Sequence, residues 1–202
     1  MRMKGYYFIT DSSLSRSGIV SDTKAALRAG VKIVQYREKS ASSRQMYQEA
    51  KKLRKVCARV TFLVNDRIDI ALSVGADGVH IGQSDLALSI ARKLLGKKKI
   101  IGVTVHNVKE ALAAQAQGAD YLAVAPIFAT STKKDAGKPA GIKLLARIKQ
   151  KVAIPVVAIG GINLAHADKV VQAGADAFCA ISEVVTKSDV KAEIKKFQRY
   201  FD

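Results

Sequence analysis

The chain has 202 residues, of which 49% are hydrophobic, and a formal net charge of +17 at pH 7. This length and composition predict one globular domain, residues 1–202, whose apolar runs are too short to span a bilayer. Its lysines are spread over expected helices without base-stacking aromatic motifs, so we expect phosphorylated small-molecule ligands and neither a nucleic-acid nor a membrane partner. The N-terminus lacks a signal-peptide pattern, which favours a cytoplasmic location, and the sequence leaves the oligomeric state open, a homo-oligomer included.

Short runs rich in Val, Ile, Tyr and Phe alternate with segments of helical periodicity along the chain. The expected strands are 5–10, 32–38, 61–65, 78–82, 99–105, 121–127, 155–160 and 177–181. The expected helices are 21–29, 42–57, 67–74, 85–95, 107–117, 142–151, 163–173 and 189–200. A polar loop, 129–140, interrupts this rhythm, and loops of that length are usually functional or mobile.

An internal repeat supports a closed architecture. Helical segments stop at Gly30, Gly75, Gly118 and Gly174, and the last three of these begin Gly-Ala-Asp motifs. Glycine just past a helix accepts the left-handed conformation that ends it. The spacings leave room for one further strand and helix between successive marks, so the sequence predicts eight units and an α/β (β/α)8 TIM barrel. In that fold, catalytic groups lie where strands end and their following loops begin.

The second expected strand ends with Gln35, Arg37 and Lys39 on one face, because strand side chains alternate. Two cations aimed together predict an anion site, the alternative being an outward strand end in ordinary salt bridges. Asp66 ends the third strand and Asp85 follows the fourth. Two carboxylates at neighbouring strand ends suit Mg²⁺, although Asp85 could instead cap a helix beginning at the next residue.

Later strands end in hydroxyl and glycine residues. Thr104 ends the fifth strand, and the loop after the sixth offers Thr130, Thr132 and Lys133, which suit a phosphate or a polar ring. Strand seven ends at Gly160-Gly161, where backbone N–H groups of such barrels frequently meet a second phosphate. The three histidines, His80, His106 and His166, show no metal-ligand spacing and suit structural roles, with His106 nearest the expected site.

Taken in barrel order, these motifs resemble the thiamine phosphate synthase family, also called thiamine-phosphate pyrophosphorylases. The resemblance covers nearly the whole chain and rests on Gln35-x-Arg37-x-Lys39, Asn65-Asp66-Arg67, the stretch Gly75 to Asp85, Ile101-Gly102-Val103-Thr104, Thr130-x-Thr132-Lys133, Ala158 to Ile162 and Ile181-Ser182. Enzymes of the family join 4-amino-2-methyl-5-hydroxymethylpyrimidine diphosphate to a thiazole phosphate and release pyrophosphate.

The resemblance implies a role for each matching residue. Mg²⁺ would be held by Asp66 and Asp85, and catalysis would involve Arg37, Lys39, Thr104 and Lys133. The residues implied for the pyrimidine diphosphate are Gln35, Tyr36, Arg37, Glu38, Lys39, Asn65, Thr104 and Lys133. Those implied for the thiazole phosphate are Thr130, Ser131, Thr132, Gly161, Ile181 and Ser182. The family mechanism is dissociative and needs no side-chain nucleophile.

Two alternatives remain open. A thiazole tautomerase-like paralogue would share the barrel, but that branch tends to lose the metal carboxylates and to carry a histidine near the end of strand six, where this chain has Ala125-Pro126. A non-catalytic phosphate-ligand-binding barrel is the second, because fold alone does not fix function. The sequence also departs from the family at Thr104, commonly serine, and at Ala125, often glycine.

Overall fold

The computed structural model describes residues 3–130, 132 and 137–201. Eight parallel strands close into a barrel in which each strand pairs with the next along the chain and the first pairs with the last. They are β1 Gly5–Ile9, β2 Ile33–Tyr36, β3 Thr61–Asn65, β4 Gly78–Ile81, β5 Ile100–Val105, β6 Tyr121–Val124, β7 Val156–Ile159 and β8 Ala177–Cys179. The expected fold class, a TIM barrel, is confirmed.

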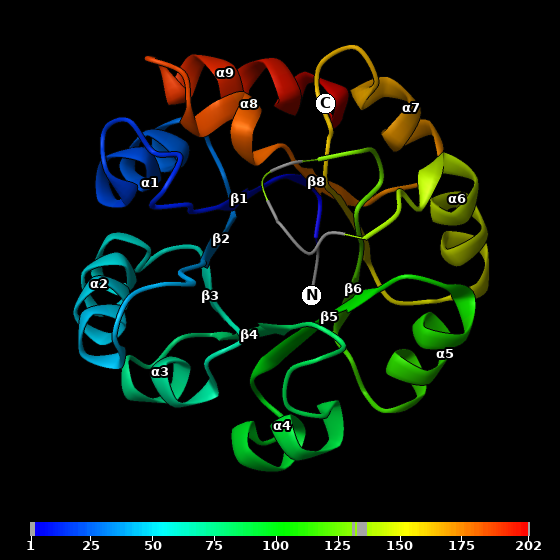
Figure 1. Cartoon of the computed structure of the whole chain (residues 1–202), viewed down its shortest axis with the longest axis horizontal. Coiled ribbons are helices and arrows are strands. Elements are labelled where there is room, and N and C mark those ends of the chain that lie inside the picture. Colours follow the sequence, from blue (N-terminus) through cyan, green and yellow to red (C-terminus); the bar gives the residue numbers. More distant parts are fainter. Residues whose placement is uncertain (1–2, 131, 133–136, 202) are drawn as a thin grey trace.

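Helices surround the barrel as an outer ring (Figure 1). They are α1 Ile19–Arg28, α2 Ser43–Val56, α3 Ile68–Ser73, α4 Leu88–Leu95, α5 Val108–Ala116, α6 Gly141–Lys151, α7 Ala167–Gln172, α8 Ile181–Val185 and α9 Val190–Gln198, followed by a 3-10 turn, Arg199–Phe201. Nowhere in the described ranges is a helix both long and apolar enough to cross a membrane.

Several expected boundaries were wrong, among them the ends of the strands expected at 32–38 and 121–127, which stop at Tyr36 and Val124. The helix expected from residue 85 begins at Leu88, and the one expected from 163 begins at Ala167. The last strand ends at Cys179, two residues early, and Ile181 opens the short helix α8 instead. A continuous apolar run does not reveal where a buried strand gives way to a buried helix, which explains the last error.

Alternation of side chains along the strands produces two apolar layers. One layer fills the barrel interior, and the other packs between the outer face of the strands and the helices. The interior layer consists of Met3, Tyr7, Ile9, Ile33, Leu63, Tyr121, Ala123, Val157, Ala177 and Cys179. Because the interior is filled up to Ile9 and Cys179, ligands can approach only above these residues, at the strand ends.

The Gly-Ala-Asp repeat stabilises the end of the barrel at which the strands begin, opposite their carboxyl ends. Each aspartate carboxylate accepts a hydrogen bond from the N–H of a residue at the start of the preceding strand and pairs with a cation of the helix that comes before that strand. The three sets are Asp77 with Phe62 and Arg54, Asp120 with Ile101 and Arg92, and Asp176 with Val156 and Lys149. The glycines before them have positive φ, as expected. This end therefore stabilises the fold and leaves the other end for chemistry.

Candidate active site

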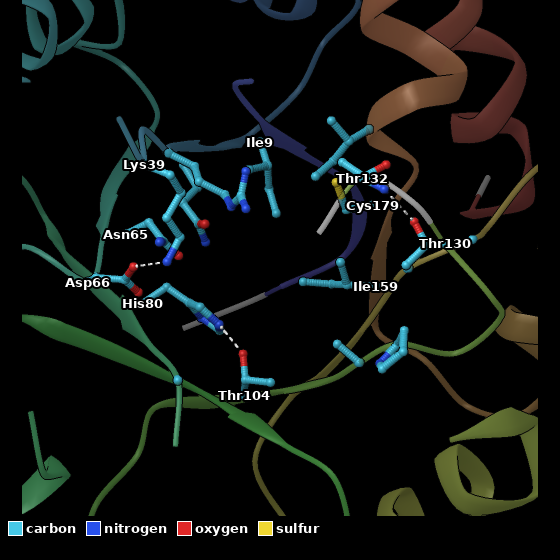
Figure 2. A pocket seen from close by; sticks show the side chains of 18 of the residues that line it. Ile9, Lys39, Asn65, Asp66, His80, Thr104, Thr130, Thr132, Ile159 and Cys179 are labelled. Atoms are coloured by element: carbon cyan, nitrogen blue, oxygen red, sulfur yellow. Dashed lines mark hydrogen bonds and ion pairs between the residues drawn. The ribbon is translucent and has the colours of Figure 1, made fainter. Parts of the chain in front are cut away.

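A cavity of about 280 Å³ opens at the carboxyl ends of the strands (Figure 2). It is lined by most of the residues that the sequence singled out. These are Gln35, Arg37, Lys39, Asn65, Asp66, Asp85, Thr104, Thr130, Thr132, Gly161, Ile181 and Ser182. Ser131 and Lys133 lie outside the described residues. The lining also includes residues that the sequence did not single out for the site, among them Gln83, Ser84 and Pro126.

The end of β2 sends alternate side chains into the cavity. Arg37 is fixed there by Asp11, a buried carboxylate directly after β1, with 3.0 Å between Nη1 and Oδ2. The backbone N–H of Arg37 also donates to the Thr10 hydroxyl at 3.0 Å. Sequence reasoning missed Asp11, although its place just past a strand was a usable signal.

Tyr36 and Glu38, also implied for the pyrimidine diphosphate, are not among the residues that line the cavity. Tyr36 points into the outer layer, where its hydroxyl donates to Glu49 at 2.7 Å. Glu38 organises the following turn, accepting hydrogen bonds from the Ser12 hydroxyl and from the N–H of Ser40 at 2.7 Å. Burial opposes ionisation of Glu38, but these hydrogen bonds prevail and lower its pKa to about 2. Both side chains shape the strand end.

Two carboxylates meet on one side of the cavity, beside a lysine. Lys39 Nζ lies 2.6 Å from Asp66 Oδ2 (Figure 2). Burial raises the pKa of Asp66, and the nearby Asp85 carboxyl acts in the same direction while Lys39 opposes it. Asp66 has a φ of 60°, a left-handed conformation rare outside glycine. Such backbone strain is typical of functional sites.

Asp85 does not cap a helix. Its Oδ2 accepts the Gly82 N–H at 2.7 Å, and α4 begins at Leu88 after Ala87. Asp66 and Asp85 together fit Mg²⁺, which takes one or two carboxylates and completes its shell with water and phosphate oxygens. Within the described ranges, no cluster of three or more His, Cys, Asp or Glu side chains forms a closed metal cage. Any metal here would therefore take its remaining ligands from water or from a bound substrate.

The opposite side of the cavity is built from backbone and hydroxyl groups. Thr130 and Thr132 lie there, away from Lys39 and Asp66 (Figure 2). Gly161 has a φ of 64°, and a Cβ on it would lie 2.4 Å from the carbonyl oxygen of Ala129. Glycine is therefore needed for both the turn and the close approach of the loop after β6. Ser182 lies in the first turn of α8, where N–H groups have no partner within the helix.

The histidines occupy three different settings. His80 is buried, and its ring nitrogens lie 2.8 Å from the hydroxyls of Tyr121 and Thr104. His106 lines the cavity beside Glu110, with 3.2 Å between Nδ1 and Oε2. His166 packs on Phe128, outside the cavity lining, with ring centroids 4.2 Å apart. The expected structural role thus suits His166, while His80 and His106 both line the cavity.

Comparison with known proteins shows the family to which the chain belongs. The family model described as thiamine monophosphate synthase matches residues 6–184. A thiamine-phosphate synthase of Methanosarcina barkeri is 51% identical over 95% of this chain and 88% of its own length. One from Chloroflexus aurantiacus is 50% identical over 95% of this chain and 90% of its own. The solved thiamine phosphate pyrophosphorylase of Pyrococcus furiosus is 37% identical, with a TM-score of 0.91, over 99% of this chain and 96% of that one. The chain therefore belongs to the thiamine monophosphate synthase family.

Proposed function

We propose that this enzyme joins 4-amino-2-methyl-5-hydroxymethylpyrimidine diphosphate to a thiazole phosphate, giving thiamine phosphate and pyrophosphate. One observation carries the proposal: a single cavity holds paired carboxylates with two cations on one side and a glycine and hydroxyl pocket on the other. Such a cavity accommodates two anionic substrates with their reacting ends between the two sides. Relatives named thiamine-phosphate synthase, about half identical to this chain, support the same activity.

The diphosphate would bind on the side of Arg37 and Lys39. When the bond between the pyrimidine methylene carbon and oxygen breaks, the electron pair leaves with pyrophosphate, and preorganised cations stabilise that negative charge. Asp66 and Asp85 would hold Mg²⁺, which supplies further positive charge against the phosphate oxygens. Lys133 would add a third cation from the loop after β6, by resemblance to the family.

Gln35, Asn65 and Thr104 would hold the aminopyrimidine ring at the mouth of the barrel. The amino group donates electron density into the ring, so the ring carries the positive charge left by pyrophosphate. The thiazole nitrogen then supplies the electron pair of the new C–N bond, and no side chain needs to act as a nucleophile. The side chains of the cavity position the two rings and exclude water.

The thiazole phosphate would bind on the opposite side, against Gly161, Thr130 and Thr132. The N–H groups at the first turn of α8, which contains Ile181 and Ser182, favour an anion there. Ser131 belongs to this set by resemblance. The tautomerase-like alternative is disfavoured because both carboxylates line the cavity. The binding-only alternative is disfavoured because fixed cations face the expected leaving group.

A two-substrate turnover assay tests the proposal. Purified protein is mixed with both substrates and Mg²⁺, and thiamine phosphate and pyrophosphate are measured over time. We expect equal amounts of both products, and loss of both in the presence of a chelator. Rearrangement of a thiazole carboxylate phosphate without consumption of pyrimidine would establish the tautomerase-like alternative instead, and binding of both ligands without any product would establish the binding-only one. The absence of nucleic-acid and membrane partners and the cytoplasmic location stay predictions, and the oligomeric state stays open.

A further inference from the structure

A continuous run of hydrogen bonds crosses the barrel interior beneath the cavity. Gln35 Nε2 donates to the Tyr7 hydroxyl at 2.7 Å, and the Tyr7 and Tyr121 hydroxyl oxygens lie 2.8 Å apart. The Tyr121 hydroxyl lies 2.8 Å from His80 Nδ1, and His80 Nε2 lies 2.8 Å from Thr104 Oγ1 (Figure 2). The run therefore joins two cavity-lining residues, Gln35 on β2 and Thr104 on β5, through three residues from β1, β6 and β4.

The middle of this run is built into the packed interior. Tyr7 and Tyr121 have no exposed surface, and His80 is 4% exposed. The Tyr121 ring fills the space left by Gly102, where a Cβ would lie 2.0 Å from Cζ. Burial raises the pKa of both tyrosines well above the ordinary value, so each phenol keeps its proton and acts once as a donor. A buried donor without an acceptor is costly, and this cost couples the bonds to one another.

The direction of the protons follows from the amide of Gln35. Because its Nε2 donates to Tyr7, the Tyr7 proton is free to bond Tyr121, and the Tyr121 proton bonds His80 Nδ1. The His80 proton then sits on Nε2 and bonds Thr104 Oγ1, which leaves the Thr104 proton for the cavity. With one proton on the His80 ring, only one other arrangement keeps all four bonds and leaves no phenol proton unbonded. It requires every proton to reverse and the Gln35 amide to turn over.

We propose that Tyr7, Tyr121 and His80 are positioning residues that hold Gln35 and Thr104 in one shared donor–acceptor pattern, selecting a 4-aminopyrimidine over a 4-oxopyrimidine. The inference rests on the proposed function, because it concerns the pyrimidine side of the same cavity. With one N–H on Tyr7, the Gln35 amide presents its oxygen and its second N–H to the cavity, while Thr104 presents a donor.

The two ring types differ in the order of their polar groups. A 4-aminopyrimidine carries an amino donor beside a ring-nitrogen acceptor, which complements the amide of Gln35. A 4-oxopyrimidine carries a carbonyl acceptor beside a ring N–H donor, so the amide must turn over to match it. Turning the amide requires all the protons of the run to reverse. The oxo ring is therefore rejected through a run whose two tyrosines lie outside the cavity lining.

The first test reads the tautomer of His80 in the protein alone, without substrates. Long-range ¹H–¹⁵N correlation spectra report which ring nitrogen carries the proton, and His106→Gln and His166→Gln assign the three histidine signals. We expect the proton on Nε2 of His80. In Tyr121→Phe the ring is kept but the run is cut, so we expect a mixture of tautomers. Tyr6→Phe is the matched control, because Tyr6 is equally buried on β1 and donates to the Ala180 carbonyl, outside the run.

The second test measures selectivity by calorimetry. The probes are the 4-amino and 4-oxo forms of 5-hydroxymethyl-2-methylpyrimidine monophosphate. We expect the ratio of their dissociation constants to fall about tenfold in Tyr121→Phe and to stay at the wild-type value in Tyr6→Phe. A merely structural role would lower stability in both variants and move neither the tautomer nor the ratio.

The outcomes separate this inference from the proposed function. A proton on Nδ1 in the wild type, or the same selectivity in both phenylalanine variants, would contradict the positioning role of the run even if thiamine phosphate is formed. Absence of thiamine phosphate together with the Nε2 tautomer and the altered selectivity would contradict the proposed function and support the positioning role of the run.

Discussion

The cations of the cavity differ in how firmly they are held. The Arg37 side chain is 16% exposed and bonds Asp11, whose side chain is 5% exposed, so it is fixed before any ligand arrives. The Lys39 side chain is 50% exposed, so its flexible ammonium can move from Asp66 to a phosphate oxygen. The Arg37 guanidinium is thus a fixed contact for a ligand, and the Lys39 ammonium is a positive charge that can move toward it.

Asp11→Asn should impair chemistry more than binding. The change keeps the shape of the side chain but removes the charge that orients Arg37, so we expect kcat to fall about 10- to 100-fold, as for loss of a charged hydrogen bond. KM for the thiazole phosphate should stay unchanged, which steady-state kinetics will check. Asp69→Asn is the matched control, because Asp69 pairs with Arg67 away from the cavity. Equal kcat in the two variants would contradict the role given to Asp11.

Asp66→Asn and Asp85→Asn should each weaken magnesium activation with the fold preserved. Each change removes an anionic oxygen from the proposed ligand set, and hard cations bind such oxygens. A magnesium titration of turnover, with circular dichroism as the fold control, measures the effect. For Asp85, an unchanged titration midpoint would show that its bond to the Gly82 N–H is its whole role.

The end of β2 and the short helix α8 show which structural features a sequence pattern predicts and which it does not. Strand alternation correctly placed Gln35, Arg37 and Lys39 in the cavity, but the family resemblance included Tyr36 and Glu38 as well. Alternation alone turns both of these away, as the structure shows. The short helix α8 was missed because its apolar residues continue the pattern of β8 without a break.

Gly161→Ala should damage the loop side of the cavity. A methyl group there meets the Ala129 carbonyl at 2.4 Å, and the left-handed φ adds strain. We expect a loss of about 2–3 kcal/mol in unfolding free energy and a raised KM for the thiazole phosphate. Gly96→Ala is the control, with a φ of 71° and no atom within 4 Å of the added Cβ. It should lose about 1 kcal/mol and keep its KM. A thiazole phosphate KM that stays at the wild-type value in Gly161→Ala would remove this glycine from the proposed pocket.

At the scale of the whole molecule, the barrel and the strand ends that carry its site could be predicted from the repeat and the strand pattern. The run of hydrogen bonds between Gln35 and Thr104 could not be predicted, because it depends on the register of five strands. Tyr7 and Tyr121 look like ordinary core residues in the sequence. Only closure of the barrel brings their hydroxyls together, 114 positions apart in the chain.

The aspartates of the Gly-Ala-Asp repeat should affect stability without affecting catalysis. Asp120→Ala removes the carboxylate that accepts the N–H of buried Ile101 and pairs with Arg92. We expect a loss of about 1–3 kcal/mol in unfolding free energy, measured by urea denaturation, with KM values unchanged. Asp168→Ala, at an exposed position of α7, should cost less than about 0.5 kcal/mol. A raised KM in Asp120→Ala would show that the two ends of the barrel are coupled.

The carboxylate partners of Arg37 and Lys39 should also weaken the binding of simple anions to the enzyme without substrate. A bare arginine and lysine in a chain of net charge +17 would collect chloride and inorganic phosphate, which are abundant around any enzyme. Here Asp11 and Asp66 already act as tethered counter-ions. A simple anion must compete with a carboxylate that never diffuses away. A diphosphate brings several charges at once, so it can take over Lys39 while Arg37 keeps its anchor.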